Sequence, residues 1–203
     1  MSIIFDCSGG NSCRNDIDTA LRMVKEIYDL AIPGTVIKWQ LFKVAGDNLP
    51  LDHEVFERAY RYAAVLGLRT TASVFDKESL DFLLTFGVPF VKIANNQKSK
   101  SMIESIPKEM PIVISIDNDD DKVKNYSNAK FIYTVSKYPA DKKDYEKFGD
   151  KLKKGISDHT ENFDLYKKYK PEIYEFHYKL KDSTGADAAS FARTFKQVQE
   201  GLK

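Results

Sequence analysis

Two histidines near the ends of predicted strands are the first residues whose types and spacing could do chemistry. His159 lies in a Ser-Asp-His-Thr run at 157–160, and His177 lies in the aromatic and β-branched segment 172–180. Imidazole is the commonest neutral metal ligand, so two rings on adjacent parallel strands could hold one divalent ion and leave positions open for substrate. A pair of hydrogen-bonded core histidines is the alternative. The Ser-Asp-His-Thr turn favours the metal site, because it is more specific than a lone histidine.

Two lysines interrupt apolar strands. Lys38 lies within 35–42 and shares a strand face with Gln40, and Lys92 lies within 89–94. A lysine in such a position is costly unless an anion compensates its charge. An internal Asp or Glu could do so, and so could an anionic ligand. Serine hydroxyls at neighbouring strand ends favour a phosphate or carboxylate site. These serines are Ser73, Ser115 and Ser157.

The composition excludes several classes of function. The chain has 203 residues, 42% of them hydrophobic, and a formal net charge of +1, so neither a nucleic acid nor an acidic membrane is an expected partner. No run approaches the roughly 20 apolar residues of a membrane span, and the N-terminus does not have the pattern of a signal peptide. The two cysteines, Cys7 and Cys13, match no zinc or redox motif. We therefore expect a cytoplasmic protein with reduced thiols.

Strands and helices alternate along the whole sequence. Periodicity and capping residues predict strands at 2–7, 35–42, 68–74, 89–94, 111–116, 129–135, 153–156 and 172–178. They predict helices at about 16–31, 52–66, 77–86, 101–106, 121–126, 141–152, 162–169 and 188–202. Eight such repeats favour a compact (β/α)₈ TIM barrel that forms a single domain over 1–203. An open doubly wound sheet is less favoured, because no Gly-x-Gly-x-x-Gly turn follows the first strand.

In such a barrel the chemistry lies at the C-terminal ends of the strands. The polar residues at these positions are Asp6, Lys38, Gln40, Ser73, Lys92, Asn95, Gln97, Ser115, Ser136, Tyr138, Ser157, His159 and His177.

The order and spacing of several short motifs resemble the sialic acid synthases. These are (β/α)₈ enzymes that condense phosphoenolpyruvate with N-acetylmannosamine or a related sugar. The similarity extends from Ser2 to about Lys196. The matching motifs are Lys-x-Gln-x-Phe-Lys at 38–43, Gly-Val-Pro-x-x-Lys-Ile at 87–93, Ser-Asp-His-Thr at 157–160 and Glu-x-His at 175–177. Ser-Val-Phe at 73–75 and Gly-Ala-Asp at 185–187 are altered forms of two others.

The resemblance implies a role for each matching residue. His159 and His177 correspond to the ligands of Mn²⁺ or Mg²⁺, which would polarise the sugar aldehyde as a Lewis acid. Asp6, Tyr138 and Asp187 correspond to residues that touch the acceptor sugar. The positions that hold the phosphate and carboxylate of phosphoenolpyruvate are Lys38, Gln40, Ser73, Lys92, Ser115 and Ser157. The implied reaction is attack of the enol carbon on the aldehyde, with water adding at the neighbouring carbon and phosphate leaving by carbon–oxygen cleavage.

Departures from the family concern mainly the residues that would contact the acceptor sugar. Asn95 and Gln97 stand where the family has a glutamate, and a glutamine cannot take a proton from water. Asp6 replaces a glutamate, and Ser136 replaces an asparagine. The family's C-terminal antifreeze-like domain has no counterpart in the sequence.

Two hypotheses follow. The first is a minimal, metal-dependent synthase acting on phosphoenolpyruvate and an amino-sugar, with Asp6, Gln97 and Asp187 as candidate catalytic positions. The second is an altered barrel that binds an anionic metabolite or a partner protein without catalysis.

Overall fold

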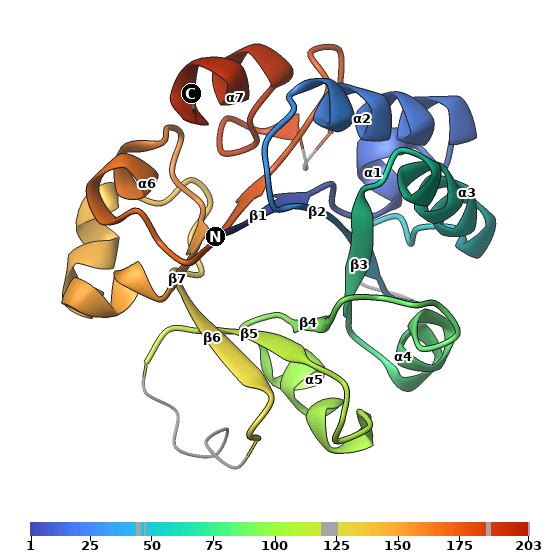
Figure 1. Cartoon of the computed structure of the whole chain (residues 1–203), viewed down its shortest axis with the longest axis horizontal. Coiled ribbons are helices and arrows are strands. Elements are labelled where there is room, and N and C mark those ends of the chain that lie inside the picture. Colours follow the sequence, from blue (N-terminus) through green and yellow to red (C-terminus); the bar gives the residue numbers. More distant parts are fainter. Residues whose placement is uncertain (44–45, 47, 119–125, 186–187, 203) are drawn as a thin grey trace.

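The computed structural model describes residues 1–43, 46, 48–118, 126–185 and 188–202. Eight parallel strands form a closed barrel in the order β1 to β8, and β8 pairs back with β1. The strands form an inner ring and the helices lie outside it (Figure 1). The strands are β1 (Ser2–Asp6), β2 (Thr35–Leu41), β3 (Arg69–Val74), β4 (Val91–Ile93), β5 (Ile112–Ile116), β6 (Ala129–Thr134), β7 (Gly155–Asp158) and β8 (Ile173–His177). The predicted (β/α)₈ TIM barrel is confirmed.

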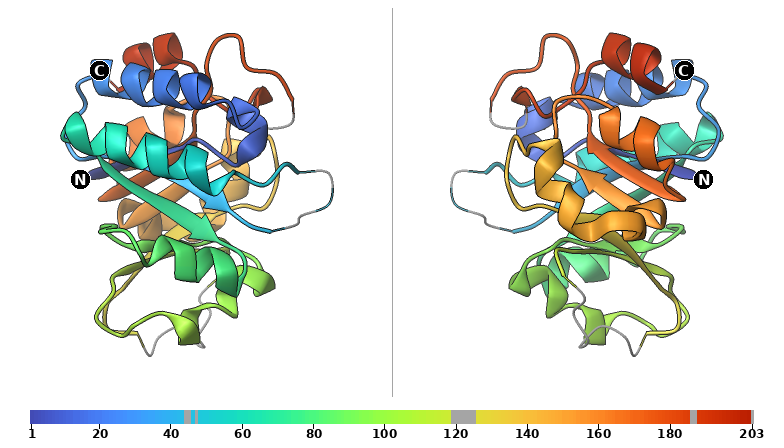
Figure 2. Two further views of the ribbon diagram at one scale, coloured as in Figure 1. Left: turned by 90° about the vertical axis from the view of Figure 1, so that its right-hand side faces the viewer. Right: turned by 90° about the vertical axis from the view of Figure 1, so that its left-hand side faces the viewer.

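The helices cover the barrel, with α2, α3 and α4 side by side along one flank and α6 on the opposite side (Figure 2). The α-helices are α1 (Gly10–Cys13), α2 (Ile17–Asp29), α3 (His53–Val65), α4 (Lys77–Leu83), α5 (Gln97–Lys100), α6 (Asp164–Tyr169) and α7 (Phe195–Leu202). Among the described residues, the 3₁₀ helices η1 (Ile103–Ser105) and η3 (Lys142–Lys153) join them.

Local sequence explains the regular helices. Asp16 caps α2 by accepting a hydrogen bond from the backbone N–H of Thr19, at 2.8 Å. The buried face of the helix follows the 3.6-residue period that packs one stripe against the barrel. This face consists of Ala20, Met23, Val24 and Ile27. Asp76 caps α4 in the same way, through the N–H of Ser79 at 2.8 Å.

Several predicted helices differ from the structure. Segment 142–153 is a 3₁₀ helix interrupted at Gly149, whose φ of 53° and ψ of −135° cannot continue a helix. The last helix begins at Phe195, later than predicted, because Arg193 bonds alongside β8. Segment 97–105 forms the short helices α5 and η1. The helix predicted at 121–126 lies almost entirely outside the described residues.

Apolar side chains form one layer outside the ring of strands and a second layer inside it. The larger lies between the barrel and the helices and contains outward-facing strand residues such as Trp39 and Phe176. The smaller fills the inside of the barrel and contains Ile4, Val36, Phe90, Val113, Ile132 and Ile173. Alternate residues of a strand share a face, so the residues two positions further on also point inward. Those residues are polar: Asp6, Lys38, Lys92, Ser115, Thr134 and Glu175.

Candidate active site

The polar ends of the strands surround one cavity of about 210 Å³ at the C-terminal mouth of the barrel. Its floor is the small apolar layer inside the barrel. The charged and polar residues that line it are Asp6, Lys38, Gln40, Ser73, Lys92, Asn95, Asn96, Ser115, Thr134, Ser136, Tyr138, Ser157, His159, Glu175 and His177.

The register of the strands brings these side chains together although they are distant in sequence. Asp6 of β1 lies opposite Lys38 on β2 and opposite His177 on β8. Ser73 of β3 lies opposite Gln40 on one side and Lys92 on the other. Between β7 and β8, Ser157 lies opposite Glu175. Closure of the sheet therefore places residues from both ends of the chain next to each other.

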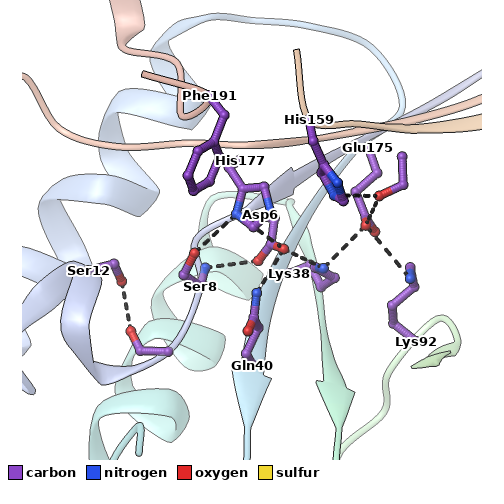
Figure 3. A network of polar contacts seen from close by, with 12 residues as sticks. Asp6, Ser8, Ser12, Lys38, Gln40, Lys92, His159, Glu175, His177 and Phe191 are labelled. Carbon is purple, nitrogen blue, oxygen red and sulfur yellow. Dashed lines mark hydrogen bonds and ion pairs between the residues drawn. The ribbon is translucent and has the colours of Figure 1, made fainter. Parts of the chain in front are cut away.

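Two carboxylates compensate the two buried lysines. Nζ of Lys38 lies 2.6 Å from Oδ2 of Asp6 and 3.4 Å from Oε1 of Glu175. Nζ of Lys92 lies 3.7 Å from the same Oε1 atom, and it donates to Oγ of Ser115 at 2.7 Å. Figure 3 shows this chain of contacts, with Glu175 between the lysines. Internal carboxylate partners, one of the two alternatives that the sequence left open, are therefore present.

The two lysines differ in pKa because their partners differ. Burial lowers the pKa of Lys92 to about 8, because the attraction of Glu175 does not outweigh the loss of hydration and the repulsion from Lys38. Burial acts on Lys38 too, but Asp6 and Glu175 outweigh it and raise its pKa. The pKa of Asp6 falls to about 2, since its contacts with Lys38 and His177 outweigh burial.

The two cavity histidines face each other, with ring centroids 5.5 Å apart. Nδ1 of His159 donates to the carbonyl of Val135 at 2.7 Å, so its proton is on Nδ1 and its lone pair is on Nε2, which lies 3.5 Å from Oγ of Ser157. Burial lowers the pKa of His159 to about 3 and also lowers that of His177, which keeps both rings neutral. Nδ1 of His177 lies 3.3 Å from Oγ of Ser8 and 3.6 Å from Oδ2 of Asp6.

Aromatic rings cover the histidines. The ring of Tyr138 stacks on His159, with centroids 4.0 Å apart. Phe191 packs edge-on against His177 at 5.0 Å and against Tyr138 at 5.1 Å. The two aromatic rings therefore pack directly on the imidazoles.

The imidazole pair suits a divalent ion. Two neutral rings that face one another across a polar cavity are the state in which histidine binds a metal. Within the described residues, no group of three or more His, Cys, Asp and Glu side chains is arranged to hold an ion. Among the residues that line the cavity, His159 and His177 are the imidazoles that could serve as ligands.

The structure brings together most of the candidate residues from the sequence. Twelve of them line the cavity: Asp6, Lys38, Gln40, Ser73, Lys92, Asn95, Ser115, Ser136, Tyr138, Ser157, His159 and His177. Gln97 does not; it is exposed at the start of α5, because Asn96 ends the connection from β4 by capping that helix. Asp187 lies outside the described residues.

Sequence reasoning assigned no role to Glu175, although it links both lysines. The sequence did contain information that pointed to Glu175. This residue is two positions before His177 on β8, so both side chains must lie on the same face of the strand.

A model of the NeuB family matches residues 38–168, which is more than half of the chain. The chain belongs to the NeuB family. The matched region contains both cavity lysines and His159, and His177 follows it on β8. No curated protein matches the chain.

Solved structures share the fold of this NeuB-family chain. N-acetylneuraminic acid (sialic acid) synthetase from Leptospira borgpetersenii, in complex with citrate, has a TM-score of 0.79 at 20% identity, covering 98% of this chain and 80% of that chain. A putative spore coat polysaccharide biosynthesis protein E from Chromobacterium violaceum has a TM-score of 0.79 at 17% identity, covering 98% and 72%. A truncated 3-deoxy-D-arabino-heptulosonate 7-phosphate synthase from Thermotoga maritima scores 0.63 at 12% identity, covering 98% and 83%.

No helix among the described residues of this NeuB-family barrel has both the length and the apolar character needed to cross a bilayer.

Proposed function

We propose that this NeuB-family barrel is a metal-dependent synthase that condenses phosphoenolpyruvate with an N-acetylmannosamine-type amino-sugar and releases phosphate. One observation carries the proposal: two lysines, four serines and two facing imidazoles line a single cavity at the C-terminal mouth. Membership of the NeuB family and the fold shared with a sialic acid synthetase support it.

Lys38, Lys92 and the serine hydroxyls hold the phosphate and carboxylate of phosphoenolpyruvate. The Oγ atom of Ser73 is buried without a hydrogen-bond partner among the described residues, and so is Oε2 of Glu175. A buried polar group without a partner is costly, and a ligand in the cavity would supply one. Gln40 donates to Asp6 at 3.0 Å and orients that carboxylate toward the sugar side.

His159 and His177 hold Mn²⁺ or Mg²⁺, which supplies Lewis-acid polarisation of the aldehyde oxygen when it is bound. The enol carbon of phosphoenolpyruvate forms a bond to the aldehyde carbon, and the aldehyde oxygen takes up a proton from solvent to become a hydroxyl group. Water adds at the neighbouring carbon, and the bond between that carbon and the phosphate oxygen breaks. Glu175 accepts the proton of this water through Oε2, the oxygen that has no partner of its own.

The test is phosphate release from phosphoenolpyruvate with Mn²⁺ and a panel of amino-sugars. Wild type is compared with His159→Ala and His177→Ala, and His53→Ala is the matched control because His53 stacks on Phe82, away from the cavity. Sugar-dependent release is expected in wild type and His53→Ala, and at least ~100-fold less in the other two. The proposal fails if no sugar elicits release above the level of His159→Ala.

A barrel that binds an anionic metabolite or a partner protein without condensing anything is the second candidate. Exposure of Gln97 favours it, as does the contact of Asn95 with Ser136 at 3.3 Å, because neither amide can act as a base. Phosphoenolpyruvate that binds by calorimetry but releases no phosphate with any sugar would establish a metabolite-binding function.

A further inference from the structure

Arg193 lies between β8 and α7, and its side chain is fully buried. Its backbone runs alongside the end of β8. The N–H of Arg193 donates to the carbonyl of His177 at 2.8 Å, and the N–H of Lys179 donates to the carbonyl of Arg193 at 3.0 Å. The backbone of Arg193 is therefore bonded to one of the two cavity histidines.

The side chain of Arg193 reaches the turn that carries the other histidine. Nη2 lies 3.1 Å from Oδ2 of Asp158, the residue before His159, and donates to the carbonyl of Asn162 at 2.5 Å. The guanidinium lies 4.8 Å from the ring centroid of Phe163, a cation–π contact. Outside the barrel, Arg193 thus connects the turn after β7 with the strand end of β8.

Asp158, the partner of Arg193, is itself hydrogen-bonded to the turn that carries His159. Its Oδ1 atom accepts from the N–H of Thr160 at 2.8 Å, and its Oδ2 atom accepts from the hydroxyl of Tyr174 at 2.5 Å. Asp158 is fully buried, so without Arg193 its charge would have no cationic partner among the described residues. The path of the chain on both sides of His159 depends on this ion pair.

Arg193 also holds the aromatic cover. Its Nη1 atom donates to the carbonyl of Phe191 at 3.1 Å. The ring of Phe191 packs on His177, as Figure 3 shows, and on Tyr138, which stacks on His159. The backbone and side chain of Arg193 together therefore contact the segments that carry His177, His159 and Phe191.

We infer that Arg193 is a positioning residue that sets the separation and orientation of the His159 and His177 imidazoles from outside the barrel. An apolar side chain could fill the same volume, but it could not bond to Asp158, Asn162 and Phe191. Where it concerns metal affinity, the inference rests on the proposed function.

The first test examines the imidazoles without any metal. The protein contains three histidines, so nitrogen–proton correlation spectra of histidine-labelled protein resolve each ring, and His53 on α3 serves as an internal reference. Arg193→Met is expected to shift or broaden the signals of His159 and His177 and to leave His53 unchanged. Arg193→Lys keeps the positive charge but lacks the planar guanidinium with its several N–H donors. It is expected to restore the signals of His159 and His177 in part.

The control variant is Tyr178→Phe. It removes a hydrogen bond to Glu26 at 2.6 Å from the residue next to His177, on the helix side of the strand. All variants are compared at temperatures where each is fully folded, and Tyr178→Phe should leave the three rings unchanged. If Arg193→Met does not fold, the ring spectra of Arg193→Lys are compared with those of wild type instead. Spectra of His159 and His177 identical to wild type in a folded Arg193 variant would overturn the inference.

The second test is Mn²⁺ affinity, measured by electron paramagnetic resonance without substrate. A side chain that orients metal ligands typically changes affinity by ~10–100-fold when it is replaced, and we expect a loss of this size in Arg193→Met and none in Tyr178→Phe. Unchanged affinity in Arg193→Met counts against the inference. If wild type itself binds no Mn²⁺, the metal part of the proposed function fails, and the ring spectra alone decide the role of Arg193.

Discussion

Nζ of Lys38 lies 2.6 Å from Oδ2 of Asp6, and each side chain is only 3% exposed. Lys25 and Asp29 on α2 form an ion pair of the same length, 2.6 Å, with exposures of 49% and 44%. The two pairs differ mainly in burial. In the buried pair, each charge depends on its partner because water does not reach it.

Asp6→Asn should lower the free energy of unfolding by about 3 kcal/mol, the lower end of the range for breaking a buried ion pair, because Lys38 keeps Glu175 as a partner. Asp29→Asn, the matched control on the surface, should cost much less, because water screens the exposed pair. Urea unfolding at pH 7 measures both changes. Equal losses in the two variants would show that burial of the Lys38 pair does not matter.

Anion binding should depend on pH through Lys92. Its ammonium must be protonated to attract a phosphate, and burial lowers its pKa to about 8. Binding of phosphoenolpyruvate should therefore be strongest below pH 8 and weaken as the pH rises through it, by up to about tenfold per unit. Lys38 does not contribute to this change, because its pKa is raised.

Isothermal titration calorimetry between pH 7 and 9.5 tests this dependence, with Lys92→Met as the reference variant. The variant should bind phosphoenolpyruvate weakly and with little change over this range. The same pH dependence in wild type and Lys92→Met would exclude Lys92 as the titrating group.

Ser73→Ala should weaken ligand binding without loss of stability. The Oγ atom of Ser73 has no partner among the described residues, so its removal breaks no protein hydrogen bond, and the free energy of unfolding should change by less than ~0.5 kcal/mol. A hydrogen bond to a charged phosphate is typically worth about 1.5–3 kcal/mol, so the dissociation constant of phosphoenolpyruvate should rise ~10–100-fold.

Ser99→Ala is the opposite case. Oγ of Ser99 is buried and donates to the carbonyl of Val74 at 2.6 Å, outside the cavity lining. This variant should lose about 1 kcal/mol of stability and keep its affinity for phosphoenolpyruvate. Calorimetry and urea unfolding on both serine variants separate the two effects. A stable Ser73→Ala protein with wild-type affinity would remove Ser73 from the binding site.

Gly155→Ala should destabilise the barrel where β7 begins. A methyl group at this position would lie 2.4 Å from Cγ2 of Ile132, inside the apolar layer under the cavity. Overpacking of this kind typically costs about 1–3 kcal/mol. Gly87→Ala should be nearly neutral, because its methyl group would meet only the hydroxyl of Tyr60, at 3.5 Å. Thermal unfolding compares the two, and a neutral Gly155→Ala would show that β6 and β7 can separate at low cost.

Local patterns in the sequence were sufficient to predict the architecture. Alternation of strands and helices predicted the barrel, and capping residues such as Asp16 placed the helix starts. The position of Lys38, Lys92 and His177 near strand ends predicted that they lie at the mouth of the barrel, and the period of two predicted that Lys38 and Gln40 share a face. Such patterns are short-range, so they can be recognised without knowing which segments meet.

The tertiary structure alone decided the pairing of charges. Lys38, Lys92 and Glu175 are distant in sequence, and only the register of the closed sheet places one carboxylate between both ammonium groups. The role of Arg193 likewise depends on a contact with Asp158 that spans 35 residues. The sequence determined which side chains share a strand face. Closure of the barrel determined which of them touch, because each strand obtains its neighbours from distant parts of the chain.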